Sequence, residues 1–176
     1  PEPGRATPWR QPSSTVWRSD LRKGVTSHDG TPFTADDVVF SFKRAADAGS
    51  DMRSYTSSIK EVRKVSDYVA EIETTSPFPI LPDVISLVYM MSKKWCEENK
   101  ALVPVDRRKG IENTASFKSN GTGPWRTKER QPTTRTVLVR NMNYWDKVES
   151  NVDEVIFTPI GNDATRVAAL MSGEIE

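Results

Sequence analysis

The sequence predicts a mixed α/β fold in which helices and strands are interspersed along the chain. Strand-like segments rich in β-branched residues lie at 59–65, 68–74 and 152–160. Segments with helical periodicity and capping residues lie at 34–49 and 163–171. Because neither kind of element dominates, we expect an α+β arrangement rather than a bundle or a barrel.

The segment after Thr34 gives the clearest helix signal. Thr34 can act as the N-cap, and Asp36 and Asp37 then stand in the first turn, where the helix dipole favours negative charge. The apolar residues of the expected buried face are Val38, Phe42, Ala45 and Ala46. We expect the helix to end at Gly49.

Turn residues divide the first half of the chain. Residues 1–15 carry four of the 12 prolines, which predicts an unstructured leader or residues added artificially. A poorly patterned strand and turn are expected over 16–25. A second helix is expected over 83–91, continuing or restarting at 95–99.

The second half of the chain begins with a polar, irregular stretch over 100–121. A hairpin is then expected from strands at 125–130 and 136–140, joined by the turn 131–134. A last helix is expected over 163–171, and Gly173 follows it.

Composition excludes several classes of protein. The 176 residues include 25 Lys and Arg against 24 Asp and Glu, a net charge of +1, so a nucleic-acid-coating protein is not expected. No run approaches the ~20 apolar residues of a membrane span, and we expect no signal peptide within the chain. The single cysteine and single histidine exclude an internal disulfide and a Cys/His zinc site. We predict no metal site and no cofactor.

No catalytic constellation emerges from the residues. His28-Asp29 could be a base with its orienting carboxylate, but no G-x-S-x-G nucleophile elbow exists, and a solvated turn explains the pair better. Cys96 precedes two glutamates, whose charge would raise the thiol pKa, so we expect a structural cysteine. Gly121-Thr122-Gly123 is too short to cradle a phosphate. We therefore predict no catalytic residues, and the chain is not expected to be an enzyme.

Four segments, in order and spacing, resemble one known family. They are VWRSDLRKGVTSHDGTPFTADDVVFSFKRA, then SIKEVRKVSDYVAEIETTSPFP, then NGTGPW followed by VLVRNMNYWD, and finally VDEVIFTPIGNDATRVAALMSGEIE. Together they resemble the extracytoplasmic solute-binding proteins of ABC importers, in the family that takes up peptides, nickel and similar solutes.

The resemblance implies a fragment of the two-lobed, type II-like periplasmic binding protein fold, with one lobe only. Residues 16–121 would match an extra subdomain of the first lobe, and residues 122–176 a returning piece of its main part. Residues 1–15 do not match. Ser19, Ser27 and Thr127 depart from the family's apolar pattern, either as natural variation or as changes that make a cut surface soluble.

The resemblance also implies a function. The full-length protein would capture a solute outside the cytoplasm, by default a peptide, and deliver it to a membrane permease. An opine, a sugar or a metal chelate is an alternative ligand. Tyr55 and Tyr89 match positions that face the ligand, although core packing would explain either. Two other hypotheses stay open: a stand-alone interaction module derived from the subdomain, and a hydrolase that uses His28.

Overall fold

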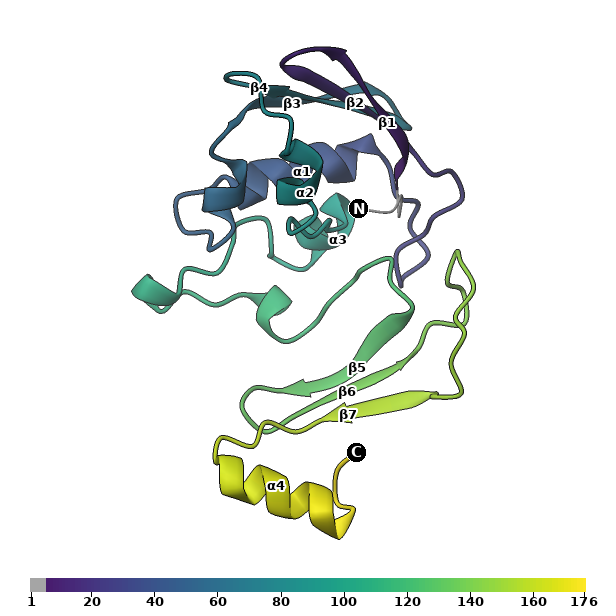
Figure 1. Cartoon of the computed structure of the whole chain (residues 1–176), viewed down its shortest axis with the longest axis vertical. Coiled ribbons are helices and arrows are strands. Elements are labelled where there is room, and N and C mark those ends of the chain that lie inside the picture. The colour runs from purple at the N-terminus through teal and green to yellow at the C-terminus, as the bar shows by residue number, and fades with distance from the viewer. Residues whose placement is uncertain (1–5) are drawn as a thin grey trace.

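The first half of the chain builds a four-stranded antiparallel sheet over a helix. The computed structural model describes residues 6–176. The strands β1 (Ala6–Ser13), β2 (Val16–Leu21), β3 (Ile59–Ser66) and β4 (Val69–Thr74) lie in the order β1-β2-β4-β3. Figure 1 shows this sheet at one end of the molecule, with helix α1 (Ala35–Ala45) running beneath it. Helices and strands are mixed, which confirms the predicted fold class.

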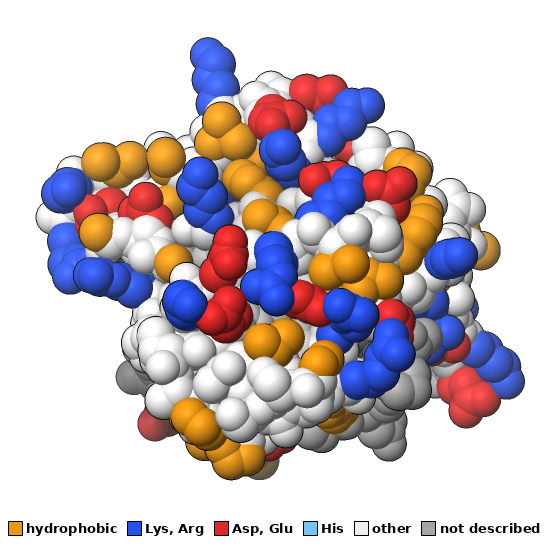
Figure 2. All heavy atoms as spheres, turned by 90° about the horizontal axis from the view of Figure 1, so that it is seen from above, with side chains coloured by type: hydrophobic (Ala, Val, Ile, Leu, Met, Phe, Trp, Pro, Cys, Tyr) orange, Lys and Arg blue, Asp and Glu red, His pale blue; other side chains and the backbone are white. Residues whose placement is uncertain are grey.

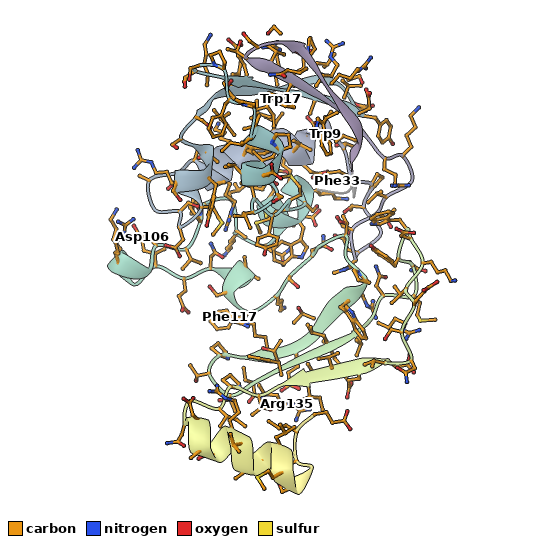
Figure 3. All side chains as sticks on the ribbon, in the orientation of Figure 1. Trp9, Trp17, Phe33, Asp106, Phe117 and Arg135 are labelled. Carbon is orange, nitrogen blue, oxygen red and sulfur yellow. The ribbon has the colours of Figure 1, made fainter. Side chains whose placement is uncertain are left out.

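The core fills the space between this sheet and α1. Because strand side chains alternate between faces, the cross-strand neighbours Trp17, Ile72 and Val62 all point to the inner face. Trp17 lies between the sheet and α1 in Figure 3. The buried residues of the cluster are Leu21, Val25, Phe33, Ala35, Val38, Phe42, Ala45, Ala70, Ile72, Leu81 and Val88.

The outer face of the sheet is charged and internally paired. Glu71 on β4 lies between Arg18 and Arg63, whose Nε atoms donate to its two carboxylate oxygens at 2.6 and 2.8 Å. These hydrogen bonds from Arg18 and Arg63 hold the pKa of Glu71 below its ordinary value. Figure 2 shows acidic and basic side chains interspersed over this face. Its mixed charge makes it a solvated surface rather than a polyanion-binding one.

Residues 6–13 form strand β1, so the prediction of an unstructured leader is wrong for them; residues 1–5 lie outside the described part of the chain. The two register irregularities of the β1–β2 pair fall between Ala6 and Trp9 and between Arg10 and Ser13. Pro8 and Pro12 stand within these two intervals. A bulged edge strand tolerates proline because it needs fewer ladder hydrogen bonds.

Helix α1 begins where the sequence predicts. Thr34 is its N-cap, and Asp37 completes a capping box by accepting the Thr34 backbone N–H at 2.8 Å. The helix ends at the C-cap Ala46, three residues before the expected stop at Gly49. Of the four residues expected on the buried face, Ala46 is exposed and the other three are buried.

A polar stripe on α1 holds in place the segment 91–103, which contains the short helix α3 (Lys93–Glu98). Besides capping its own helix, Asp37 accepts the backbone N–H of Lys93 at 2.8 Å. Ser41 accepts the N–H of Met91 at 2.8 Å, and Arg44 donates to the carbonyls of Ala101 and Val103. The spacing of Asp37, Ser41 and Arg44 places them on one side of the helix. Burial raises the pKa of Asp37, although the hydrogen bonds that it accepts from the backbone of Lys93 and Thr34 oppose the shift.

Short helical elements lie between α1 and β3 and between β4 and the second half of the chain. They are η1 (Arg53–Thr56), α2 (Leu81–Ile85), α3 (Lys93–Glu98), η2 (Arg107–Lys109) and η3 (Thr114–Ser116). The predicted helix over 83–91 is therefore wrong beyond Ile85. Pro82 stands at the start of α2, and Ser86 ends it by donating to the Asp83 carbonyl at 2.6 Å. Among the described residues, no helix is long and apolar enough to cross a bilayer.

The second half of the chain forms a three-stranded sheet followed by a helix. Strands β5 (Trp125–Gln131), β6 (Arg135–Arg140) and β7 (Glu154–Phe157) are antiparallel in that order. Helix α4 (Asp163–Ser172) follows, and Gly173 caps it with φ of +75°, a left-handed conformation that glycine adopts readily. Figure 1 shows this sheet below the first one, with α4 beyond it.

The second sheet leaves much apolar surface exposed. Apolar residues occur in both β6, at 137–139, and β7, at 155–157. Val137 is 1% exposed, whereas Ile156 and Phe157 are 54% and 61% exposed. Helix α4 adds Val167, Leu170 and Met171, all exposed. The unpaired apolar surface therefore lies on β7 and α4.

Replacing Asp37 by Asn should lower the free energy of unfolding by about 1–3 kcal/mol. An amide offers one acceptor oxygen where the carboxylate satisfies two buried backbone N–H groups, so one of them loses its partner. Asp36→Asn is the matched control. Asp36 is exposed and pairs with Lys64 at the surface, which predicts a loss below ~1 kcal/mol. Urea unfolding followed by circular dichroism measures both; equal losses would contradict the bridging role of Asp37.

The exposed β7 edge should make the 176-residue chain associate as its concentration rises. An open edge strand with apolar side chains invites pairing with another chain. The double variant Ile156→Lys and Phe157→Lys should reduce association, whereas Val65→Lys, at the exposed β3 edge of the other sheet, should not. Size exclusion with light scattering measures this. A wild-type monomer at every concentration would contradict it.

Candidate functional site

A groove of about 790 Å³ lies between the two sheets. One wall comes from residues 50–52, from Met91 and from the irregular segment that contains Phe117. The other wall comes from β5 and β6 and from the hairpin turn that joins them. Figure 3 shows Phe117 in the connection between the two sheets, above β5. The volume is within the ~300–1,000 Å³ range of small-molecule sites.

The groove offers contact surface rather than reactive groups. Met52, Met91, Phe117 and Leu138 supply its apolar surface. Its polar positions include hydroxyls such as Thr127, whose Oγ1 lies 2.7 Å from the Ser119 Oγ. Charged side chains, among them Asp51, Glu112 and Lys118, also line the groove, so it combines apolar contact surface with polar groups that could orient a bound solute.

The two arginines of the groove are held in place by backbone carbonyls. The Arg130 Nε donates to the Ser116 carbonyl at 2.9 Å, which ties β5 to the opposite wall. The Arg44 Nε donates to the Ala101 carbonyl at 3.1 Å, and burial lowers the pKa of this guanidinium. A guanidinium is a planar, charged group with several N–H donors. The two arginines would offer fixed positive charge to a bound solute.

The two predicted ligand-facing tyrosines occupy different environments. Tyr55 lies on η1, is partly buried and packs against the hydrophobic core. Tyr89 follows α2 and is 73% exposed. Neither ring lines the groove, but their sequence neighbours Met52 and Met91 do. The ligand-facing roles of both tyrosines stay predictions.

His28 and Asp29 belong to a joint between the two sheets. The His28 Nε2 lies 3.1 Å from the Gly123 carbonyl oxygen, and its Nδ1 accepts the Gly121 N–H at 3.3 Å. The Asp29 carboxylate accepts a hydrogen bond from the Asn120 amide at 2.8 Å. Although burial alone would raise it, hydrogen bonds from Thr31 and Asn120 hold the pKa of Asp29 below its ordinary value. With both ring nitrogens engaged, His28 has no free nitrogen for the base role of the hydrolase hypothesis.

Loop residues after β6 complete the joint. The Asn141 side chain donates to the same Gly123 carbonyl at 3.1 Å. The Trp145 Nε1 donates to the Thr122 carbonyl at 3.0 Å, and its ring packs against the core of the first sheet. The Arg22 guanidinium lies 4.7 Å from the centre of that ring. The motifs HDG, NGTG and NMNYW, far apart in the sequence, therefore meet at one place.

Cys96 is a buried structural residue, as predicted, but for a different reason. Burial raises the pKa of its thiol to about 11. The neighbouring carboxylates, which we expected to cause the shift, contribute less than burial does. Within residues 6–176, no three His, Cys, Asp or Glu side chains gather in a way that could hold a metal ion.

Sequence reasoning missed the groove itself. Thr127 had been identified only as a departure from the family's apolar pattern, and it lines the groove. Phe117 stands in a polar stretch without periodicity, which gives no sign of its place. Ser27 is 6% exposed, so it is not a change that solubilises a surface. No local pattern shows which segments face each other across the two sheets.

Known proteins similar to this chain share one fold and differ in their ligands. The periplasmic oligopeptide-binding protein OppA of Salmonella typhimurium is 27% identical over a 205-residue alignment covering 100% of this chain and 34% of OppA. The structure of NikZ from Campylobacter jejuni, in complex with Ni(L-His), superposes with a TM-score of 0.82 at 24% identity. That superposition covers 99% of this chain and 34% of NikZ.

A third similar protein has a structure in complex with mannopinic acid. The structure of MoaA from A. tumefaciens R10, in complex with mannopinic acid, superposes with a TM-score of 0.81 at 26% identity, covering 99% of this chain and 34% of MoaA. The chain thus spans about a third of the length of these relatives.

One family model covers the whole chain. The model described as "Bacterial extracellular solute-binding proteins, family 5 Middle" matches residues 1–176. The match includes residues 1–15, so the expectation that these residues fall outside the resemblance is wrong. The chain belongs to the family 5 bacterial extracellular solute-binding proteins, as a part of the two-lobed fold.

Proposed function

We propose that a full-length protein containing this chain is the solute-binding component of an ABC importer. It would capture its solute outside the cytoplasm and deliver it to a membrane permease. The observation that carries the proposal is the groove between the two sheets, in a chain whose whole length matches the family. Its walls offer burial and a few fixed polar groups, which suits reversible capture.

A peptide is the solute class that we propose. Short peptides combine apolar side chains with regularly spaced backbone donors and acceptors. The thioethers of Met52 and Met91 adapt to side chains of varied shape, and the hydroxyls of the groove could meet a peptide backbone. OppA, whose name states oligopeptide binding, supports the same class. Opines and metal chelates are the alternatives, since MoaA and NikZ hold such ligands.

We propose that the two halves of the chain belong to different parts of the two-lobed fold. Residues 16–121 would form the extra subdomain of the first lobe, and residues 122–176 a returning piece of its main part. A ligand cleft in a two-lobed protein needs both lobes, because good sites bury ~70–90% of the ligand surface. This chain, including both walls of its own groove, would then form one side of the cleft between the lobes.

The full-length protein should bind short peptides with micromolar affinity or better, whereas the 176-residue chain should not. One side of the cleft alone leaves much of the ligand in water and recovers only part of the binding energy. Titration calorimetry of both proteins with a defined set of peptides of two to five residues measures the difference. Opines and nickel–histidine serve as comparison ligands. Micromolar peptide binding by the short chain, or binding of only a comparison ligand by the full protein, would contradict the proposal.

Substitutions of Tyr55 and Tyr89 should have different effects on the free energy of unfolding. In the 176-residue chain, Tyr55→Ala should lower the free energy of unfolding by about 1–3 kcal/mol because the ring packs against the core. Tyr89→Ala should change it by less than ~0.5 kcal/mol because the ring is exposed.

In the full-length protein, each change should weaken peptide binding if the ring faces the solute, whereas Tyr89→Phe should retain it. Denaturant unfolding measures the change in stability, and calorimetry measures the change in peptide affinity. Unchanged affinity in Tyr89→Ala would remove Tyr89 from the site.

A further inference from the structure

The hydrogen bonds of His28 require one particular state of its ring. The Gly123 carbonyl can only accept, so the Nε2 that lies 3.1 Å from it must carry a proton. The Gly121 N–H can only donate, so the Nδ1 that faces it at 3.3 Å must be bare. Together the two contacts select the neutral imidazole with its proton on Nε2. A protonated ring would carry a second N–H on Nδ1, directed at the Gly121 N–H.

The surroundings of the ring also oppose its protonation. The ring is half-buried, and burial is the main reason why the pKa of His28 lies below its ordinary value of 6.5. Arg126 on β5 pushes the pKa down further, while the Gly123 hydrogen bond and the neighbouring Asp29 oppose the shift. Lys128 on β5 lines the same hollow of the surface, where its Nζ pairs with the Glu154 carboxylate at 2.9 Å.

The contacts of this ring span the two halves of the molecule. His28 belongs to the turn before α1, while Gly121 and Gly123 lead into β5. The backbone of His28 adds a hydrogen bond from its N–H to the Gly121 carbonyl at 2.8 Å. The groove takes its walls from both halves, so its shape depends on how the two halves are oriented at this joint.

We propose that His28 is a positioning residue whose neutral ring fixes the second sheet against the first, and that protonation of the ring loosens this joint. Protonation removes the Gly121 N–H···Nδ1 bond and places two N–H groups against each other. The other contacts of the joint, through Asn120, Asn141 and Trp145, do not require a proton to move. The joint therefore becomes looser on protonation without coming apart.

The sign of the pH dependence follows from the direction of the pKa shift. The folded chain holds the pKa below 6.5, so the unfolded or opened chain binds the proton more readily. The stabilisation is complete above pH 6.5 and is lost as the pH falls from there through the folded pKa. The opening constant of the joint should rise about tenfold for each pH unit that separates the two pKa values.

His28 is the single histidine of the chain, so nuclear magnetic resonance can follow its ring without ambiguity. The ¹⁵N shifts of the ring report its tautomer and its pKa directly. The Gly121 amide reports the joint, and the Ile72 amide in the first sheet is the internal reference. Both are followed in the 176-residue chain from about pH 8 to about pH 5, the range in which a histidine titrates.

Two variants test whether the ring causes the effect. His28→Gln can still donate to the Gly123 carbonyl but cannot titrate, so the Gly121 amide should lose its pH dependence over this range. Asn120→Ala removes the neighbouring Asp29 contact but keeps the ring, so the pH dependence should persist.

We expect the Nε2–H tautomer at pH 8, a pKa below 6.5, and a Gly121 amide that titrates with the ring while Ile72 does not. The Nδ1–H tautomer, a pKa at or above 6.5, or an unchanged Gly121 titration in His28→Gln would each overturn the proposal. The ring measurements on the wild-type chain decide even if a variant fails to fold. Peptide binding is not a readout here, so failure of the proposed function would leave this test intact.

Discussion

The arrangement of the molecule depends on one carbonyl oxygen, that of Gly123. It receives hydrogen bonds from His28, in the turn before α1, and from Asn141, in the loop after β6. A carbonyl oxygen has two lone pairs, so both contacts can be satisfied at once. Each half of the molecule has its own sheet, and this acceptor is where their loops meet. The groove between the sheets follows from this joint.

A second constraint acts within the first half. The segment 91–103 contains the short helix α3, and the backbone groups at and beyond its two ends need partners when they are buried. Asp37, Ser41 and Arg44 supply those partners from one side of α1. Met91 is thereby held where it lines the groove. The same helix packs its apolar side into the core, so it supports both the fold and the wall of the candidate site.

The features of the fold that depend only on neighbouring residues could be predicted from the sequence. The N-cap at Thr34 is set by its own backbone neighbours, and it was predicted correctly. Strand β1 was missed because proline argues against a strand, and the bulges that accommodate it depend on pairing with β2. The helix expected over 83–91 ended early because Ser86 caps it locally, while Val88 is buried outside any helix. Apolar periodicity alone cannot separate these two ways of burying a side chain.

The candidate site was less predictable than the fold, since it depends on a relation between distant segments. The motifs HDG, NGTG and NMNYW were recognised from the sequence as turns, each with its own local reason for glycine or asparagine. In the structure these segments bond to one another, and this explains why a side chain that can both donate and accept, such as histidine, suits position 28. The ring donates from one nitrogen and accepts at the other, toward two backbone groups of one loop. His28, which the sequence predicts to lie in a solvated turn, therefore makes structural hydrogen bonds to the loop that contains Gly121 and Gly123.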